Sequence, residues 1–255
     1  MKYYSTNGEA PVATLEKAVV KGLAEDRGLY MPQTIKSLPK VFFDNIQDMT
    51  FQDIAYNVAS AFFGEDVDLD ALEDLVYDTL PFDCPVVKVR DNIYSLELFH
   101  GPTFAFKDFG ARFMGGMLGL LNRSAEDLVV LTATSGDTGS AVAAGFYNVP
   151  GIKVVVLYPN GKVSNLQESQ MTTLGGNIRP VRVNGNFDDC QALVKQVFSD
   201  AEFRSRVNVT SANSINILRW IPQSFYYFYG WAQWKKATGK SKPEIVVPSG
   251  NYGNI

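Results

Sequence analysis

Four segments in the second half of the chain predict buried strands of a parallel sheet. Two of them are almost continuously apolar, with no alternation between polar and apolar positions. A strand that is covered by helices on both faces is expected to have this pattern. The predicted strands cover Leu128 to Thr134, Ile152 to Tyr158, Ile178 to Val183 and Ile245 to Val247.

Helical patterns lie between these strands. Small residues from Ser140 to Phe146 favour a helix, and Leu166, Gln170 and Leu174 recur on one face of a more polar helix. A third helix opens at Asp188, where an acidic residue complements the helix dipole. Strands and helices that alternate in this way predict an α/β fold, with a parallel sheet flanked by helices.

Residues 1–82 predict a separate, mostly helical unit. Apolar residues recur there at helical spacing, and the expected helices cover residues 15–23, 51–62 and 68–80. Pro81 and Pro85 then interrupt the pattern. We therefore expect a boundary near residue 82, with the α/β region covering residues 83–255.

A lysine stands between a predicted strand and a predicted helix. A strand pattern from Ile93 to Phe99 precedes Lys107, and a helical pattern from Phe109 to Leu121 follows it. Three nearby phenylalanines predict a lowered pKa for the Lys107 amine, because desolvation disfavours the ammonium form. A neutral amine is a nucleophile, and one of its uses is a Schiff base with an aldehyde cofactor. The alternative is a surface lysine whose stem lies along a core helix.

Composition and charge exclude several other classes of protein. The chain has 255 residues, 46% of them hydrophobic and 20% charged, which is ordinary for a globular protein. A net charge of -4 argues against a nucleic-acid partner. No apolar run reaches the length of a membrane span, and the first residues lack the pattern of a secretory signal. We therefore expect a cytoplasmic protein without a membrane partner.

The inventory of reactive side chains narrows the chemistry further. Cys84 and Cys190 lie far apart, which excludes a CxxC motif and suits a reducing compartment. The single histidine, His100, excludes HExxH, and no GxSxG or GxGxxG motif occurs. No metal site is expected. An enzyme with this sequence must use lysine, carboxylates, hydroxyls or a cofactor.

Three further turns follow strand patterns and resemble the Lys107 loop in composition. They cover Ser135 to Gly139, Val209 to Asn216 and Ser249 to Asn254. Their glycines let the main chain approach a ligand, and a following helix N-terminus favours an anion. Each turn alone is also compatible with a routine strand-to-helix connection. Together they predict a ligand site at the carboxyl edge of the sheet.

Seven segments of the chain, taken in order, resemble the threonine synthases. That family contains pyridoxal-phosphate (PLP) enzymes of the tryptophan-synthase β-like fold, called fold type II, and the match is closest to its long bacterial and fungal form. The resemblance spans essentially the whole chain. Its segments are YYSTNG at the start, DRGLYMP at 26–32, HGPTFAFKDFGARFMG at 100–115, TATSGDTGSA at 132–141, LYPNGKVSNLQESQMTTLGGNI at 157–178, SANSIN at 211–216 and VPSGNYGN at 247–254.

The resemblance implies a fold and a domain order. Residues 1–82 would form the N-terminal domain of the family, and residues 83–255 the PLP-dependent region. That region would contain a smaller subdomain at about 110–200 and the start of the second half of the large domain at about 201–255. Family members continue well beyond the position of Ile255. We therefore expect an incomplete large domain, weak or absent PLP retention and little turnover for this chain alone.

The resemblance also assigns residues by their match to family motifs. Lys107 would hold the cofactor aldehyde as a Schiff base and act as the catalytic residue. One loop would hold the cofactor phosphate, one would contact its ring, and one would bind the substrate phosphate. The implied cofactor-binding residues are Lys107, Ser135, Gly136, Asp137, Ser249, Gly250, Asn251, Tyr252, Gly253 and Asn254, and the implied substrate-binding residues are Thr134, Thr138, Asn213, Ser214, Asn216 and Arg219.

Two of these assignments have a specific chemical argument. Related PLP enzymes usually have asparagine where this chain has Asp137. A second anion would repel a substrate carboxylate, so Asp137 is expected to orient its loop or to contact the ring hydroxyl. Arg219 suits a phosphate because its planar guanidinium pairs with phosphate oxygens. The alternative for Arg219 is a surface salt bridge.

The reaction implied by the resemblance is the conversion of O-phospho-L-homoserine and water to L-threonine and phosphate, the last step of threonine biosynthesis. The freed Lys107 amine would move protons at the α and β carbons of the substrate. Two alternatives stay open at this point. One is a sibling PLP lyase that acts on another phosphorylated amino acid. The other is a truncated α/β module that binds a ligand or partner without turnover.

Overall fold

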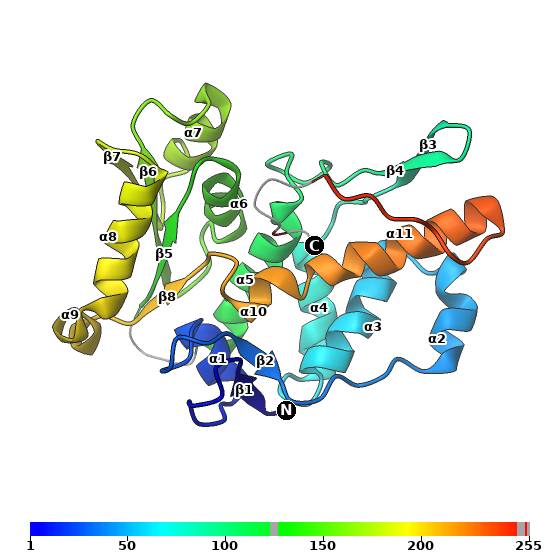
Figure 1. The fold of residues 1–255 in the computed structure, drawn as a ribbon, viewed down its shortest axis with the longest axis horizontal. Helices are drawn as coiled ribbons and strands as arrows, with labels where there is room; N and C mark the ends of the chain where they lie inside the picture. Colours follow the sequence, from blue (N-terminus) through cyan, green and yellow to red (C-terminus); the bar gives the residue numbers. More distant parts are fainter. Residues whose placement is uncertain (123–126, 249–252, 254–255) are drawn as a thin grey trace.

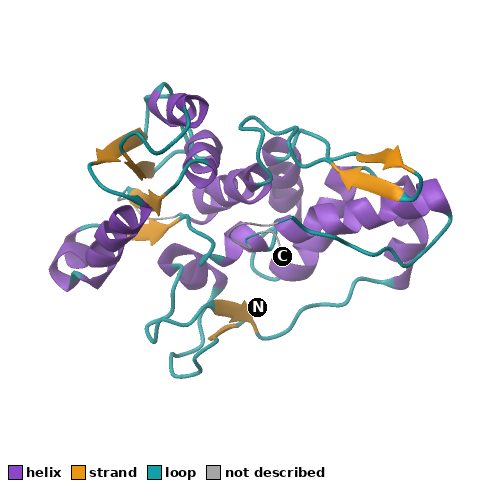
Figure 2. Ribbon diagram, turned by 45° about the horizontal axis from the view of Figure 1, so that its top comes forward, coloured by secondary structure: helices purple, strands orange, loops and turns teal. Residues whose placement is uncertain are grey.

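A computed structural model of the chain describes residues 1–122, 127–248 and 253. These residues form a four-stranded parallel sheet covered by helices, beside a helical assembly that includes the N-terminal segment (Figure 1). Figure 2 shows the same division, with the strands of the parallel sheet gathered at one end of the molecule. The α/β fold class predicted from the sequence is confirmed.

The parallel sheet has the strand order β7-β6-β5-β8. Leu131 of β5 lies opposite Val155 of β6 on one side and opposite Ser211 of β8 on the other. Because all four strands are parallel, their carboxyl ends meet at one edge of the sheet. The strands are β5 Leu128–Ala133, β6 Ile152–Pro159, β7 Ile178–Val183 and β8 Val209–Ser211.

Helices cover both faces of this sheet. Neighbouring residues of a strand point to opposite faces. Val130 accordingly lies in the main core with residues of α6, whereas Leu131 packs with Cys190 and Val194 of α8. Figure 1 shows α6 and α8 on opposite sides of β5. The helices of this part are α6 Asp137–Gly145, α7 Asn165–Thr172, α8 Phe187–Ser199 and α9 Ala201–Arg206.

The N-terminal part combines a short antiparallel strand pair with helices. Thr50 begins α3 with a capping box, in which its hydroxyl accepts from the Asp53 amide and the Asp53 carboxylate accepts from the Thr50 amide. The elements are β1 Tyr3–Ser5, α1 Leu15–Lys21, β2 Tyr30–Pro32, α2 Lys40–Asn45, the 3-10 helix η1 Ile46–Asp48, α3 Phe51–Phe63 and α4 Leu69–Thr79.

Aromatic side chains fix the helix that begins at Lys107. Phe109 is fully buried, and its ring centroid lies 5.5 Å from that of Phe51, 5.0 Å from that of Phe82 and 5.1 Å from that of Tyr226. All three pairs have the edge-to-face geometry that aromatic rings prefer. The helices packed here are α5 Lys107–Leu121, α10 Ile217–Trp220 and α11 Gln223–Thr238.

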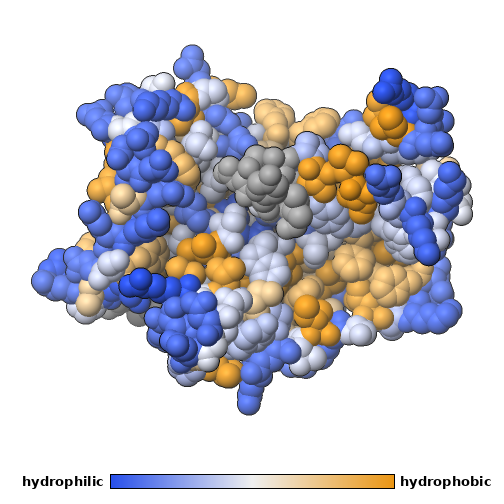
Figure 3. All heavy atoms as spheres, viewed as in Figure 1, coloured by the Kyte–Doolittle hydropathy of each residue, from blue (hydrophilic) through white to orange (hydrophobic). Residues whose placement is uncertain are grey.

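An antiparallel hairpin and the segment before Pro248 expose apolar side chains. The hairpin consists of β3 Val86–Arg90 and β4 Ile93–Leu96. Ile245 and Val246 are 60% and 82% exposed, and apolar side chains show on the surface beside the grey C-terminal atoms (Figure 3). The predicted strand from Ile245 to Val247 is wrong, because the segment has no strand partner among the described residues to supply ladder hydrogen bonds.

Most other predicted elements are confirmed within a few residues. Strands β5, β6 and β7 lie where the apolar runs predicted them, and α5 and α8 follow their helical patterns. The strand expected to reach Phe99 ends at Leu96, and the helix expected from Ser140 already begins at Asp137. No helix in the described part of the chain is long and apolar enough to cross a membrane.

Candidate active site

Lys107 is the first residue of α5, and its side chain is half-buried. Its Nζ donates to the Oγ1 of Thr138 at 2.8 Å and lies 5.9 Å from the ring centroid of Phe106. Burial lowers the pKa of the Lys107 amine, the Asp137 carboxylate raises it, and the Arg219 guanidinium lowers it again. The position is thus a partly desolvated amine held by a hydroxyl, rather than a lysine that reaches into solvent.

The loop before Lys107 is held by the next residue along the helix. Asp108 is fully buried, and its carboxylate accepts from the backbone amide of Thr103 at 2.9 Å and from the Thr103 hydroxyl at 2.6 Å. Burial raises the pKa of the Asp108 carboxyl. Phe104, in the same loop, is 66% exposed and has a φ of 60°, a conformation that bulky residues rarely adopt. The carboxylate of Asp108 therefore fixes the loop that leads to Lys107.

The turn after β5 brings Thr138 to this amine. The buried hydroxyl of Thr134 accepts from the amides of Gly136 at 2.9 Å and Gly139 at 2.8 Å. Gly136 has a φ of 145°, which residues with a side chain rarely adopt. Helix α6 starts directly afterwards at Asp137, so its first turn faces Lys107. Ser135 and Asp137 are exposed.

The loop after β8 meets the same edge of the sheet. The side chain of Asn213 donates to the backbone oxygen of Ala133 at 3.1 Å and accepts from the Thr132 hydroxyl at 3.3 Å. The buried Asn216 amide is occupied at both ends, since it donates to the backbone oxygen of Val19 at 2.8 Å and accepts from the Leu218 amide at 3.1 Å. Asn213 thus ties its loop to β5, whereas Asn216 caps α10 and holds it to α1.

Arg219 lies inside the protein, with 1% of its surface exposed. One terminal nitrogen donates to the backbone oxygen of Ala212, and the Nε has no hydrogen-bond partner among the described residues. Burial lowers the pKa of the guanidinium to about 10, and the Asp108 carboxylate opposes that shift. The alternative of a surface salt bridge is therefore wrong. A buried donor without an acceptor is costly, which makes this nitrogen suited to a bound anion.

The predicted phosphate loop lies mostly outside the described residues. Ser249, Gly250, Asn251, Tyr252 and Asn254 are not described, so their roles stay predictions. Gly253 is described, and a Cβ built on it would lie 3.6 Å from the Oγ of Ser214. Ser214 is exposed. Two predicted loops that are far apart in the sequence therefore meet at this point.

Helix α7 contributes two glutamines that sequence reasoning did not assign to the site. The side-chain nitrogen of Gln167 donates to the Asp137 carboxylate, and that of Gln170 lies 3.5 Å from the backbone oxygen of Thr103. Their spacing of three residues places them on one helix face, which was the only signal available in the sequence. Asp108 was also missed, because nothing in the local pattern indicates that its carboxylate is buried.

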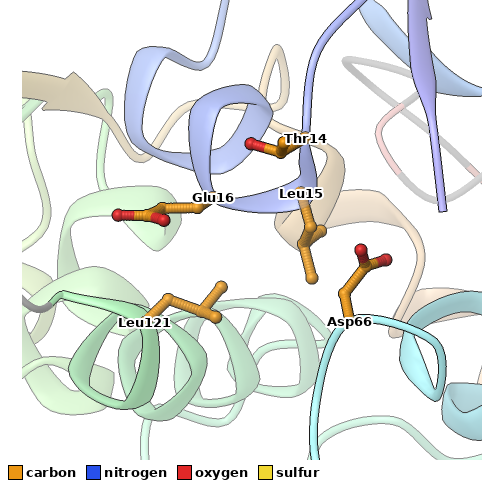
Figure 4. A pocket seen from close by; sticks show the side chains of 5 residues that line it. All are labelled: Thr14, Leu15, Glu16, Asp66 and Leu121. Atoms are coloured by element: carbon orange, nitrogen blue, oxygen red, sulfur yellow. The ribbon is translucent and has the colours of Figure 1, made fainter.

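Two surface cavities lie away from Lys107. One, of about 200 Å³, is lined by Thr14, Leu15, Glu16, Asp66 and Leu121, between α1 and the end of α5 (Figure 4). The other, of about 450 Å³, is apolar and lies between α8 and the sheet. None of the predicted site residues in the described part of the chain lines either cavity. Among the described residues no group of acidic, histidine or cysteine side chains is arranged to hold a metal ion.

Comparison with known proteins places this geometry in a family. The family model described as threonine synthase N terminus matches residues 2–80, and the one described as pyridoxal-phosphate dependent enzyme matches residues 83–255. The threonine synthase of Escherichia coli is 43% identical over 255 residues, which is 100% of this chain and 59% of that protein. This chain therefore spans about three-fifths of the length of that relative.

Solved structures give the same result for the fold. The crystal structure of threonine synthase from Escherichia coli matches with a TM-score of 0.87 and 42% identity, over 100% of this chain and 59% of that chain. A structure of PLP-bound threonine synthase from Brucella melitensis matches with a TM-score of 0.87 and 36% identity, over 100% of this chain and 56% of that chain. These similarities bear out the PLP fold type II expected from the motifs.

Proposed function

This chain belongs to the family of pyridoxal-phosphate dependent enzymes, and on that basis we propose that it carries out the threonine synthase reaction. In this reaction O-phospho-L-homoserine and water are converted to L-threonine and phosphate. Curated relatives from bacteria and yeast that bear this name match the chain along nearly its whole length. The observation that carries the proposal is the half-buried Lys107 amine, which lies at the sheet edge beside Thr138 and close to the charge of Arg219.

The residues near Lys107 fit an aldehyde cofactor that carries a phosphate. A partly desolvated amine with a lowered pKa is suited to bond a carbonyl carbon. The turn at Gly136 leads directly into α6, and the hydrogen bond to Thr138 places the N-terminus of that helix next to this amine, where a helix favours an anion. In this proposal Lys107 binds the cofactor aldehyde and the turn from Ser135 to Asp137 lies against its ring. The loop from Ser249 to Asn254 would surround its phosphate.

Lys107 is also the proposed proton carrier. When bound, PLP supplies an electron sink that stabilises negative charge on the carbons of the substrate. The Nζ of Lys107 would take a proton from the α carbon and move protons at the β carbon. Burial lowers the pKa of this amine, which increases the share of the neutral form that can take a proton, and the ammonium that results can return it. Thr138 would hold Nζ in position between these transfers.

The substrate phosphate is assigned to the loop after β8 and to Arg219. The Nε of Arg219, which no described residue binds, supplies a buried donor that an incoming phosphate oxygen would satisfy. Asn213 and Ser214 lie in the loop that leads to this helix, which Asn213 ties to the end of β5, and Thr134 and Thr138 lie in the turn that follows β5. Asn216 has both ends of its amide occupied, so its substrate role would require a change in those contacts.

The cellular setting belongs to the same proposal. Cys84 and Cys190 are buried free thiols, which suits the reducing cytoplasm in which we place the protein. Its partner would be a small phosphorylated amino acid rather than a macromolecule. O-phospho-L-homoserine is the proposed substrate. Phosphate release from O-phosphothreonine, measured in parallel, distinguishes this reaction from that of a sibling lyase.

The test combines covalent trapping with turnover. A version of the protein that spans the full length of its relatives is purified, incubated with PLP, reduced with borohydride and digested, and the modified lysine is identified by mass spectrometry. We expect the adduct on Lys107. Phosphate release from O-phospho-L-homoserine should fall by about 10²–10⁴-fold in Lys107→Ala.

The matched control is Lys162→Ala, which removes an exposed lysine from the turn after β6. It should keep both the adduct and the turnover of the parent protein. An adduct on another lysine, or unchanged turnover in Lys107→Ala, would refute the assignment of Lys107. Faster phosphate release from O-phosphothreonine would replace the proposed substrate by that of a sibling lyase.

A further inference from the structure

Helix α7 touches both loops that surround Lys107. Gln167 donates to the carboxylate of Asp137 at the start of α6, and Gln170 approaches the backbone oxygen of Thr103 in the loop before α5. The side-chain oxygen of Gln170 is buried and has no hydrogen-bond partner within the described part of the chain. The sequence predicted a helix in this segment and a resemblance to a family motif, and neither gave a role to the two glutamines.

The amide of Gln167 is fixed in its orientation. The Ser164 hydroxyl donates to the Oε1 of Gln167 at 2.9 Å and accepts from the Gln167 backbone amide at 3.3 Å. The backbone oxygen of Gln167 accepts from the Ser140 hydroxyl of α6 at 3.3 Å. With Oε1 held by Ser164, the Nε2 is the end that points to Asp137. The contact thus joins two packed helices, and it is not an isolated surface pair.

The contact between Gln167 and Asp137 determines where a negative charge lies relative to the Lys107 amine. Asp137 and Arg219 are the charged groups that act on the Lys107 amine, with opposite sign. Asp108, its neighbour on α5, is turned back to Thr103. Within the described residues, Lys107 forms no ion pair within 4.0 Å, and its Nζ donates to Thr138 instead. The carboxylate next to Thr138 in the chain is therefore bound to Gln167 and not to the amine.

We propose that Gln167 is a positioning residue, which holds the Asp137 carboxylate on the α7 side and so prevents it from forming an ion pair with Lys107. An ion pair would favour the ammonium form of the lysine, which is neither a nucleophile nor a base. The Gln167 amide supplies a neutral partner for the carboxylate without adding charge to the site. This inference rests on the proposed role of Lys107 as the reactive amine.

Competitive labelling of the amine tests the inference directly. The protein without added cofactor is treated with a trace of acetic anhydride across a pH series, and the acetylated fraction of Lys107 is measured by mass spectrometry. We expect the titration midpoint of Lys107 to rise by about one pH unit in Gln167→Leu, as for an amine that gains an opposite charge nearby. Below the midpoint, this corresponds to about tenfold less labelling. Gln167→Met serves as a second variant if Gln167→Leu does not fold.

The double variant shows whether the effect passes through Asp137. In the Asp137→Asn background there is no carboxylate to release, so Gln167→Leu should leave the midpoint of Lys107 unchanged. The matched control is Gln196→Leu, which changes an exposed glutamine of α8 on the other face of the sheet and should have no effect. An unchanged or lowered midpoint in Gln167→Leu, or an equal rise in the Asp137→Asn background, would overturn the proposal.

This experiment separates the inference from the proposed function. Labelling of Lys107 reports the protonation of the amine whether or not the protein binds PLP or turns over a substrate. A shifted midpoint together with absent PLP trapping would support the role of Gln167 and contradict the proposed cofactor chemistry. An unshifted midpoint together with normal PLP trapping would contradict the role of Gln167 and support the proposed cofactor chemistry.

Discussion

The Nζ of Lys107 and the Oγ1 of Thr138 lie 2.8 Å apart, at the first turns of two helices that pack against each other. The N-terminal end of a helix carries partial positive charge, which disfavours a cation. Two such ends therefore act on one amine, in addition to its burial. Burial is the main cause of the lowered pKa of Lys107, the Asp137 carboxylate opposes it, and the Arg219 guanidinium acts in the same direction as burial.

Removal of the Thr138 hydroxyl should leave the Lys107 amine without the hydrogen bond that positions it. We expect Thr138→Val to slow the bonding of PLP to Lys107 by up to about tenfold, since one hydrogen bond contributes about 0.5–1.5 kcal/mol. The rate is measured by borohydride trapping at successive times. Thr138→Ser retains the hydroxyl and should stay close to the parent rate. Equal rates in both variants would mean that the contact does not position Lys107.

The loop before Lys107 should depend on Thr103. Thr103→Val removes the hydroxyl that donates to Asp108 at 2.6 Å and leaves a fully buried carboxylate with fewer partners. We expect a loss of about 1–3 kcal/mol in the free energy of unfolding, measured by urea denaturation. Thr103→Ser keeps the donor and should retain most of that stability. A valine variant as stable as the parent would contradict this account.

Gly110 should not tolerate a side chain, whereas Gly119 on the same helix should tolerate one. A Cβ on Gly110 would lie 2.3 Å from the backbone oxygen of Arg219, so α10 would have to move away from α5. We expect Gly110→Ala to cost about 1–3 kcal/mol of stability, as overpacking does. At Gly119 the nearest atom is a methyl of Val149 at 2.9 Å, which can shift.

Gly119→Ala is therefore the control for Gly110→Ala. Alanine has the higher helix propensity, by about 1 kcal/mol, which offsets the small rearrangement of Val149. Thermal unfolding of both variants gives the comparison. Similar losses in the two variants would show that the close approach of α5 and α10 does not determine the cost.

Asp26 should make the stability of the N-terminal part depend on pH in the acid range. Its carboxylate accepts from the Ser5 hydroxyl at 2.6 Å and from the amides of Gly28, Ala10 and Glu9 at 2.8–3.0 Å. The hydrogen bond from Ser5 has the largest effect, and together these bonds lower the pKa of Asp26 to about 2. The stabilisation is therefore complete above the unfolded pKa of about 3.9 and is lost as the pH falls through about 2.

Asp26→Asn tests this dependence. We expect a lower urea midpoint than that of the parent at pH 6, and a difference that shrinks as the pH approaches 2. Asp44→Asn alters an exposed carboxylate that pairs with Lys40 on the surface, and it should change the midpoint little. A difference between Asp26→Asn and the parent that stays constant with pH would exclude the ionised carboxylate as the cause.

The sheet and its helices were predictable where one physical signal dominated. Strands β5 and β6 are covered on both faces, so their sequences are almost continuously apolar, with Thr132 and Lys153 as the exceptions. Helix α11 was not predicted, because aromatic and polar residues alternate around it without one clear apolar face. The segment from Ile245 to Val247 has strand composition, but whether it pairs depends on a neighbour that local sequence does not reveal.

The site was predictable in part for a similar reason. The turn from Ser135 to Gly139 and the loop after β8 follow neighbouring parallel strands, which bring them to one edge. The expectation that Lys107 follows a strand of the same sheet is wrong, because β4 belongs to a separate antiparallel hairpin, and Lys107 meets Thr138 as the first residue of α5. The motif resemblance added the cofactor, and the family models bear out that resemblance. The contact between Gln167 and Asp137 joins residues 30 positions apart through polar side chains. Such a contact depends on how α7 packs, and no periodic pattern encodes it.

The contact between Asn216 and Val19 has a consequence for protein synthesis. The two residues lie 197 positions apart, and the Asn216 amide donates to the backbone oxygen at the end of α1. A ribosome adds about 5–20 residues per second, so Val19 is made roughly 10–40 s before its partner exists. During translation the first helix therefore lacks its contacts with β8 and α10 until those segments emerge, although α5, which it also contacts, is made earlier. A chain that stalls before residue 216 would leave that helix available to chaperones and proteases.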